Sequence, residues 1–179
     1  MQVMGISGMP GSGKGLVSDM ASERGAIIVS MGDIVREEAS IRGESSKETA
    51  RKLREEFGQY VVSERTIEKI KKLSEEDDDK LFIVEGIRSH HEVAMFKENF
   101  ENFFILSIFA NPQLRFERLV ERQREDDSTD YKEFQKRDEQ ELGFGIGNVI
   151  SLSDRLIINE STLESYEKQI DEFLEEIGL

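Results

Sequence analysis

The sequence contains no cysteine and only two histidines. The absence of cysteine excludes disulfide bonds and thiolate metal sites, and two histidines leave too few ligands for a zinc centre. No apolar run reaches the length of a membrane span, and the first residues show no basic segment followed by an apolar one. We therefore expect no membrane span and no export signal, and the expected location is the cytoplasm.

Positive charge is also scarce, with 24 Lys and Arg residues against 38 Asp and Glu residues and a formal net charge of −14. Such an acidic chain is not expected to bind nucleic acid or an anionic membrane. Any phosphate site must then be a local basic pocket in an acidic protein. With 179 residues, the chain is expected to form a single domain, residues 1–179, around one core.

One glycine-rich stretch carries a specific motif. Gly8-Met9-Pro10-Gly11-Ser12-Gly13-Lys14 follows the apolar run 3–6 and fits the G-x-x-x-x-G-K pattern of a phosphate-binding P-loop. Glycines let successive N–H groups turn inward around a polyphosphate, and a following helix adds the positive end of its dipole. A lysine there places an ammonium group near the β- and γ-phosphates. The residues predicted to bind ATP as the donor are Gly8, Pro10, Gly11, Ser12, Gly13, Lys14, Gly15 and Leu16.

The alternative is a flexible turn without a ligand. Three glycines, a proline and a lysine in register between a strand and a helix favour the P-loop. The stretch departs from the motif after Lys14, because Gly15 and then Leu16 stand where Ser or Thr usually offers a hydroxyl to Mg2+. A nucleotide-binding regulator with little turnover therefore stays an alternative to an enzyme.

The hydropathy pattern alternates between strands and helices, which predicts an α/β fold with a parallel sheet. Ligands of such sheets bind beyond the carboxyl ends of the strands. Strands are expected at 3–6, 26–29, 81–84, 103–110 and 156–158. Helices are expected at 15–25, 33–42, 49–73 with a break at Gly58, 91–99, 113–124, 131–142 and 163–177, with a turn at 30–33 and a flexible connector at 143–147.

Several strings resemble nucleotide kinases, and together they cover nearly the whole chain. G-x-P-G-S-G-K-G resembles the adenylate kinase branch, while residues 30–36 and 84–88 resemble the T-G-D-x-x-R and D-G-F-P-R strings of nucleoside monophosphate kinases. The resemblance implies a P-loop NTPase fold, with a five-stranded parallel sheet and helices on both faces. It also implies a core of 1–30, 80–121 and 143–179, an acceptor-binding insert at 31–70 and a short lid at 122–142.

The resemblance assigns an acceptor site. It implies that Arg36 and Arg88 grip the acceptor phosphate, with Met31 and Gly86 beside them, and that Glu85 orders Mg2+ through water. A planar guanidinium suits this role because it donates two parallel hydrogen bonds to phosphate oxygens. Glu92 stands near a position where adenylate kinases use Gln to read adenine. An ionised carboxylate only accepts hydrogen bonds, so the acceptor base stays open.

A second group of arginines resembles the donor side and lid of the same kinases. Arg118 and Arg122 lie four residues apart on one helix face, and the resemblance places Arg118 at the donor and Arg122 on the transferring group. Arg124-Glu125-Asp126-Asp127 followed by Arg137 resembles a short R-x-D-D lid. The alternative is a solvent-exposed helix with ion pairs to interleaved acids, which are Glu117, Glu121 and Glu125.

Residues 154–163 resemble the carboxyl-terminal string of dephospho-coenzyme A kinases, which shapes the donor base pocket. The strings E-G-I-R-S, R-x-D-D and E-L-G-F-G-I-G resemble a small group of archaeal proteins described as adenylate-kinase-related. The resemblance implies an enzyme that moves the γ-phosphoryl of ATP-Mg to a nucleoside monophosphate, with AMP favoured. Its catalytic residues are then Lys14, Arg88, Arg122 and Arg137. A hydroxyl kinase with Asp33 as base is the alternative enzyme, and the oligomeric state stays open.

Overall fold

The computed structural model describes residues 1–77, 79–123 and 127–179. In this part of the chain, strands and helices alternate. The strands are β1 (Gln2–Ser7), β2 (Ile27–Ser30), β3 (Leu81–Glu85), β4 (Phe103–Phe109) and β5 (Arg155–Ile158). The helices are α1 (Lys14–Glu23), α2 (Met31–Arg42), α3 (Ser46–Phe57), α4 (Val61–Ser74), α5 (His90–Asn99), α6 (Pro112–Arg122), α7 (Tyr131–Phe144), α8 (Ile146–Ser151) and α9 (Leu163–Glu176).

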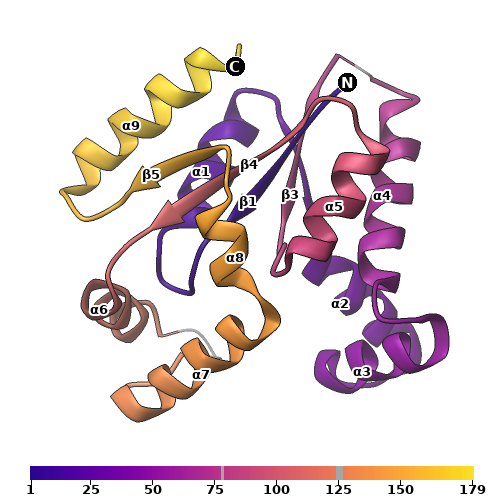
Figure 1. Cartoon of the computed structure of the whole chain (residues 1–179), viewed down its shortest axis with the longest axis horizontal. Coiled ribbons are helices and arrows are strands. Elements are labelled where there is room, and N and C mark those ends of the chain that lie inside the picture. Colours follow the sequence, from indigo (N-terminus) through magenta and orange to yellow (C-terminus); the bar gives the residue numbers. More distant parts are fainter. Residues whose placement is uncertain (78, 124–126) are drawn as a thin grey trace.

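Among the described residues, five strands form one parallel sheet in the order β2-β3-β1-β4-β5. Because all the strands run the same way, their carboxyl ends meet at one edge (Figure 1). There, Glu85 of β3 pairs with Ile6 of β1 on one side and with Ser30 of β2 on the other. The P-loop, the segment after β3 and the start of α2 are therefore neighbours. The predicted α/β P-loop fold is confirmed.

Each face of the sheet has its own core because side chains alternate along the strands. Val3, Phe82 and Ile105 point to one face, where they pack with buried side chains of α4, α5 and α8. Met4 and Ile83 point to the other face and pack against α1 and α9. Both faces are covered by helices, so the central strands are continuous apolar runs.

Two local predictions were wrong. Residues 143–147 were expected to be a flexible connector, but α7 continues to Phe144 and α8 begins at Ile146. Only Gly145, with φ of 101°, separates the two helices. Burial of Ile146 at 3% exposure and of Val149 at 2% outweighs the low helix propensity of glycine. The turn expected at 30–33 is also absent, because α2 begins at Met31. The break expected at Gly58 is confirmed, since α3 ends before it and α4 starts after it.

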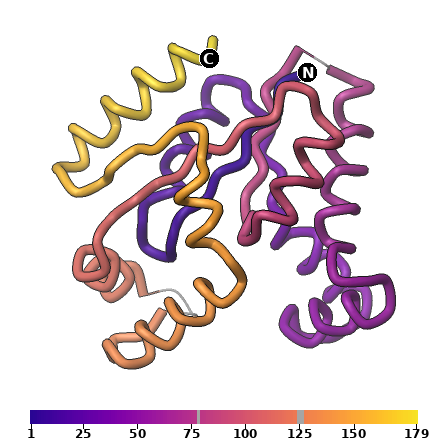
Figure 2. The backbone as a smooth tube through the Cα atoms, in the orientation of Figure 1, coloured from indigo at the N-terminus to yellow at the C-terminus, as the bar shows by residue number. Residues whose placement is uncertain are grey.

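Two helical arms extend beyond the carboxyl edge of the sheet. Figure 1 shows α2 and α3 on one side of this edge and α6 and α7 on the other. The first pair belongs to the predicted acceptor insert and α7 to the predicted lid, and closure by either segment stays a prediction. Both chain ends lie away from these arms, at the opposite end of the molecule (Figure 2). None of the described helices is both long and apolar enough to span a bilayer.

Candidate functional site

The P-loop between β1 and α1 is held by hydrogen bonds to its own carbonyls. The Ser12 N–H donates to the Met9 carbonyl at 3.1 Å, and Lys14 Nζ donates to the carbonyls of Gly8 and Met9 at 2.6 and 3.1 Å. Gly13 has φ of 102°, and a Cβ there would lie 2.4 Å from Asn159 Nδ2. Only glycine fits this position. Helix α1 begins at Lys14, so the positive end of its dipole lies at the loop.

Three side chains from distant parts of the sequence donate hydrogen bonds to backbone carbonyls of the P-loop. Asn159 Nδ2 donates to the Ser12 carbonyl at 2.9 Å, and the Tyr166 hydroxyl donates to the Gly13 carbonyl at 3.0 Å. Arg115 Nη1 donates to the Pro10 carbonyl at 3.1 Å. Burial raises the pKa of Tyr166, which keeps its hydroxyl protonated as a donor. The sequence singled out the string around Asn159, but neither Arg115 nor Tyr166 as a site residue.

Arg115 also joins the P-loop to α7. Its side chain is 3% exposed and donates to both carboxylate oxygens of Asp138, at 2.8 and 2.5 Å. Its guanidinium carbon lies 5.1 Å from the ring centre of Phe134, and its Nε donates to the Ala110 carbonyl at 3.1 Å. One buried cation therefore links the P-loop, α6 and α7.

Lys14 lines the cleft and is partly buried. Burial lowers its pKa to about 8, and the carboxylates of Glu141 and Glu85 partly oppose that shift. The positive charges of Arg88 and Arg115 add to the lowering. Lys14 therefore stays charged at neutral pH while being held in a poorly solvated place, where an anion would be a strong partner.

The arginines predicted for the acceptor come from two different elements. Arg36 of α2 donates from Nε and Nη2 to Asp33 Oδ1 at 3.0 and 2.5 Å. Arg88 follows β3, and its Nη1 lies 3.3 Å from Glu141 Oε1 of α7. Its guanidinium carbon also lies 5.7 Å from the ring centre of Phe144. Each arginine is therefore paired with a carboxylate that a ligand phosphate would have to replace.

Glu92 and Glu141 differ in how their carboxylates are used. Glu92 Oε2 accepts from the N–H groups of Arg88 and Ser89 at 2.8 and 3.0 Å, and so forms a capping box at the start of α5. That oxygen is committed to the helix cap, and the predicted reading of a base by Glu92 stays a prediction. Glu141 is 9% exposed and faces the cleft from α7, although the sequence did not mark it as a site residue.

On the side predicted to hold the donor, Arg118 contacts the carboxyl-terminal string 154–163. Its Nη2 donates to the backbone carbonyl and to Oδ1 of Asn159 at 3.0 and 3.2 Å, while its buried Nη1 has no hydrogen-bond partner among the described residues. Arg122 and Arg137 both donate to Asp127. The rest of the predicted lid string, residues 124–126, lies outside the described residues.

These groups face one cleft with a volume of about 830 Å³. Most of the predicted site residues line this cleft, but Ser12 and Leu16 do not. Ser12 is a fully buried residue of the P-loop, and Leu16 packs against the core. Asp33, the predicted base of the alternative enzyme, does not line it either. Among the described lining residues, four are acidic and eight are basic, the basic ones being Lys14, Arg36, Lys47, Arg54, Arg88, Arg118, Arg122 and Arg137. Although the chain as a whole is acidic, basic residues outnumber acidic ones among the described residues that line this cleft.

The predicted magnesium ligand lies at the same edge. Glu85 lines the cleft at the end of β3, and its Oε1 accepts a hydrogen bond from Ser18 Oγ of α1 at 2.5 Å. No group of three or more potential metal ligands occurs in the described part of the chain. Mg2+ commonly uses one or two carboxylates together with substrate phosphates and waters. The residues present therefore fit an ion that arrives with a nucleotide, with Glu85 as the carboxylate that would hold it through water.

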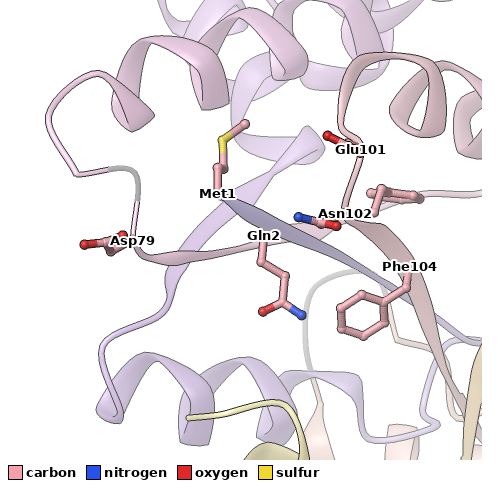
Figure 3. Close-up of a pocket in the computed structure, with 7 residues that line it drawn as sticks. Met1, Gln2, Asp79, Glu101, Asn102 and Phe104 are labelled. Atoms are coloured by element: carbon pink, nitrogen blue, oxygen red, sulfur yellow. The ribbon is translucent and has the colours of Figure 1, made fainter.

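A second hollow, of about 560 Å³, lies at the amino ends of β1 and β4 (Figure 3). Its described lining includes Asp79, Glu101 and Asn102, and no Lys or Arg. The described lining offers no basic side chain to a phosphate, and the hollow is at the sheet edge opposite the P-loop.

Comparison with known proteins agrees with this geometry. The model of a family described as "AAA domain" matches residues 7–135. A "UPF0200 protein" from Methanothermobacter thermautotrophicus is 48% identical over 178 residues, which cover 99% of this chain and 92% of that protein. The chain belongs to the AAA-domain and UPF0200 families. The match of the AAA-domain family spans the P-loop, the acceptor-side arginines and the start of α7.

Solved structures show the same fold at low sequence identity. A shikimate kinase from Bacteroides thetaiotaomicron superposes with a TM-score of 0.64 at 12% identity, over 99% of both chains. TT1252 from Thermus thermophilus superposes with a TM-score of 0.69 at 16% identity, over 99% of this chain and 98% of that one. Both likenesses show that the chain shares this fold. Neither likeness identifies an acceptor.

Proposed function

We propose that the chain transfers the γ-phosphoryl group of ATP-Mg to a nucleoside monophosphate, with AMP as the favoured acceptor. The observation that carries the proposal is the shared cleft of Lys14, Arg36 and Arg88, which come from three separate elements. Lys14 belongs to the donor phosphates, and the two arginines face the same space from the side of α2 and β3. Such an arrangement suits two phosphorylated ligands that meet end to end.

Phosphoryl transfer to another phosphate needs little from the protein besides alignment and positive charge. The acceptor oxygen is already anionic, so no side chain has to remove a proton. Lys14 and Arg88 would neutralise charge on the transferring group, and Arg122 and Arg137 would join them when the predicted lid closes over the donor. Arg118, whose buried Nη1 has no hydrogen-bond partner in the described part of the chain, would donate to the donor phosphates.

The test is single-turnover transfer from ATP labelled at the γ-phosphate to a panel of nucleoside monophosphates, with dephospho-coenzyme A as a hydroxyl acceptor. We expect labelled nucleoside diphosphate with at least one monophosphate. Arg36→Ala should raise the KM for the monophosphate about ten- to a hundredfold, because charge-assisted hydrogen bonds contribute about 1.5–3 kcal/mol. Its KM for ATP should not change.

Arg51→Ala is the matched control for Arg36→Ala. Arg51 lies on α3, is exposed, and pairs with Glu48 and Glu55 instead of lining the cleft. It should leave both KM values unchanged. Tight nucleotide binding without any labelled product from any acceptor would refute the proposal and favour the nucleotide-binding regulator.

One observation favours a second candidate, transfer to a hydroxyl group. Glu141 presents a nearly buried carboxylate to the cleft beside Arg88, where a second phosphate would meet like charge and a hydroxyl would meet a base. It replaces Asp33, which lies outside the cleft lining, as the candidate base. Glu141→Gln should leave transfer to a monophosphate intact, but should slow transfer to a hydroxyl about 10²–10⁴-fold. Glu139→Gln, an exposed change on the same helix, is the control.

A further inference from the structure

The P-loop lacks the hydroxyl that normally follows its lysine, and the structure shows no direct replacement at that point. Gly15 has no side chain, and Leu16 packs against the core. The magnesium side of the cleft is therefore left with the carboxylate of Glu85 and with Asp19, which also lines the cleft. Asp19 accepts no hydrogen bond from a side chain of the described residues, whereas Glu85 is tied to a hydroxyl.

That hydroxyl belongs to Ser18, one helical turn after Lys14 on α1. Ser18 is 5% exposed, and its Oγ donates to Glu85 Oε1 at 2.5 Å. In the described part of the chain, this is the single hydrogen bond of the Glu85 side chain. Among the residues that the structure describes, no group donates a hydrogen bond to the second carboxylate oxygen, Oε2.

A glutamate at the end of a strand has several rotatable bonds and would normally occupy several rotamers. A hydrogen bond to one carboxylate oxygen restricts these rotamers before any ligand arrives. The Glu85 side chain then loses less conformational entropy when a ligand binds. Hydrogen bonds from residues that do not themselves touch the metal commonly orient the carboxylates that bind it. Ser18 does not itself line the cleft, so it can act on a ligand only through Glu85.

We propose that Ser18 is a positioning residue for magnesium–nucleotide binding: it holds the Glu85 carboxylate toward the phosphate site and so replaces the missing P-loop hydroxyl. The inference rests on the proposed use of this cleft for a magnesium-bound nucleotide. It names a different residue from the motif, and it does not depend on which acceptor is used.

The test is calorimetric titration with ADP, with and without MgCl2, on the full chain. Magnesium should tighten ADP binding in the parent protein. Ser18→Ala should weaken Mg-ADP binding about tenfold, from loss of one charge-assisted hydrogen bond, and should leave ADP binding without magnesium unchanged. Ser18→Thr keeps the hydroxyl and should retain the effect of magnesium. Ser22→Ala, an exposed change on the same helix, is the matched control and should behave like the parent.

Two further variants test whether Ser18 acts through Glu85. Glu85→Ala should remove most of the effect of magnesium, and Ser18→Ala should add nothing in that background. Gly15→Ser in the Ser18→Ala protein should restore part of the effect, because a Cβ at Gly15 meets no heavy atom within 4 Å. Additive losses in the double variant, or no gain from Gly15→Ser, would overturn the inference.

The outcomes separate this inference from the proposed function. If Ser18→Ala binds Mg-ADP as the parent does, or weakens ADP equally with and without magnesium, Ser18 has only a structural role tying α1 to β3. The proposed function would survive either result. If the parent protein binds no ADP under any condition, both the inference and the proposed function fail. Thermal unfolding of each variant, followed alongside, identifies one that has lost its fold.

Discussion

Replacing Lys14 with methionine should stabilise the free protein while abolishing its nucleotide binding. Lys14 is partly buried in the cleft, and burial is the main cause that lowers its pKa from 10.5 to about 8. A group whose pKa is lowered on folding destabilises the fold at every pH where it is charged. Methionine fills nearly the same space without charge, so Lys14→Met removes that penalty.

The magnitude follows from the pKa of Lys14. A fall from 10.5 to about 8, at about 1.4 kcal/mol for each pKa unit, amounts to roughly 3 kcal/mol. The ammonium keeps some contact with solvent, and its hydrogen bonds to Gly8 and Met9 are lost in the variant. We therefore expect Lys14→Met to raise the free energy of unfolding by about 1–3 kcal/mol. For a chain of this size, that corresponds to about 2–12 °C in Tm.

The pH dependence has a definite sign. Below about pH 8, Lys14 is charged in both the folded and the unfolded chain, so the advantage of the variant is constant and largest. Between about pH 8 and 10.5, the unfolded chain keeps the proton that the folded chain has lost, so the parent gains stability as the pH rises. The advantage of Lys14→Met should disappear over that window.

Urea denaturation without nucleotide, at pH 7 and at steps up to pH 10.5, measures this difference. Lys72→Met, an exposed change on α4, is the control and should be neutral. Saturating Mg-ATP should then stabilise the parent but not Lys14→Met, because only a protein that binds the ligand gains stability from it. An unfolding free energy for Lys14→Met at or below the parent value at pH 7, or a gap that persists to pH 10.5, would refute the reasoning.

Three further changes probe the supports of the loop. Arg115→Met should destabilise the protein by about 3 kcal/mol in urea denaturation, because it leaves the Asp138 carboxylate without its buried partner; a change below 0.5 kcal/mol would show that the pair is not coupled to the fold. Tyr166→Phe should lower the free energy of unfolding by about 1 kcal/mol, because it deletes the hydrogen bond to the Gly13 carbonyl. Calorimetry should also show weaker ADP binding. An unchanged stability and an unchanged affinity would contradict a role of Tyr166 in holding the P-loop. Gly13→Ala should abolish ADP binding in the same titration, because its Cβ would lie 2.4 Å from Asn159 Nδ2; retained affinity would mean that the loop shifts freely.

The sequence could predict the parts of the site that depend on local patterns. The glycines and Lys14 form a contiguous motif, so their arrangement follows from the chain around them. Arg36 and Arg88 lie just after strands of a parallel sheet, and parallel topology brings the carboxyl ends of such strands to one edge. Their meeting with Lys14 in one cleft could therefore be expected before any coordinates.

The residues that the sequence could not mark act through contacts between distant segments. Tyr166 lies 153 positions from Gly13, and Ser18 lies 67 positions from Glu85. Tyr166 lies in the helix predicted at 163–177, but that prediction says nothing about which carbonyl its hydroxyl contacts. Glu141 lies in a charged helix where a solvent-exposed side chain is the usual expectation. Its burial depends on contacts between α7 and distant segments, such as the one with Arg88, which no local pattern encodes.

Carboxylates that pair with the arginines of the cleft explain how so many cations can share it without a ligand. Arg36 is paired with Asp33, Arg88 with Glu141, and Arg122 and Arg137 with Asp127. These pairs limit repulsion among the cations, but a ligand must compete with every pair that it disrupts. A single phosphate would replace one carboxylate by a similar charge and gain little. A polyphosphate can instead combine the P-loop N–H groups, Lys14 and several arginines at once, so the internal pairs favour ligands that carry several phosphates over simple anions.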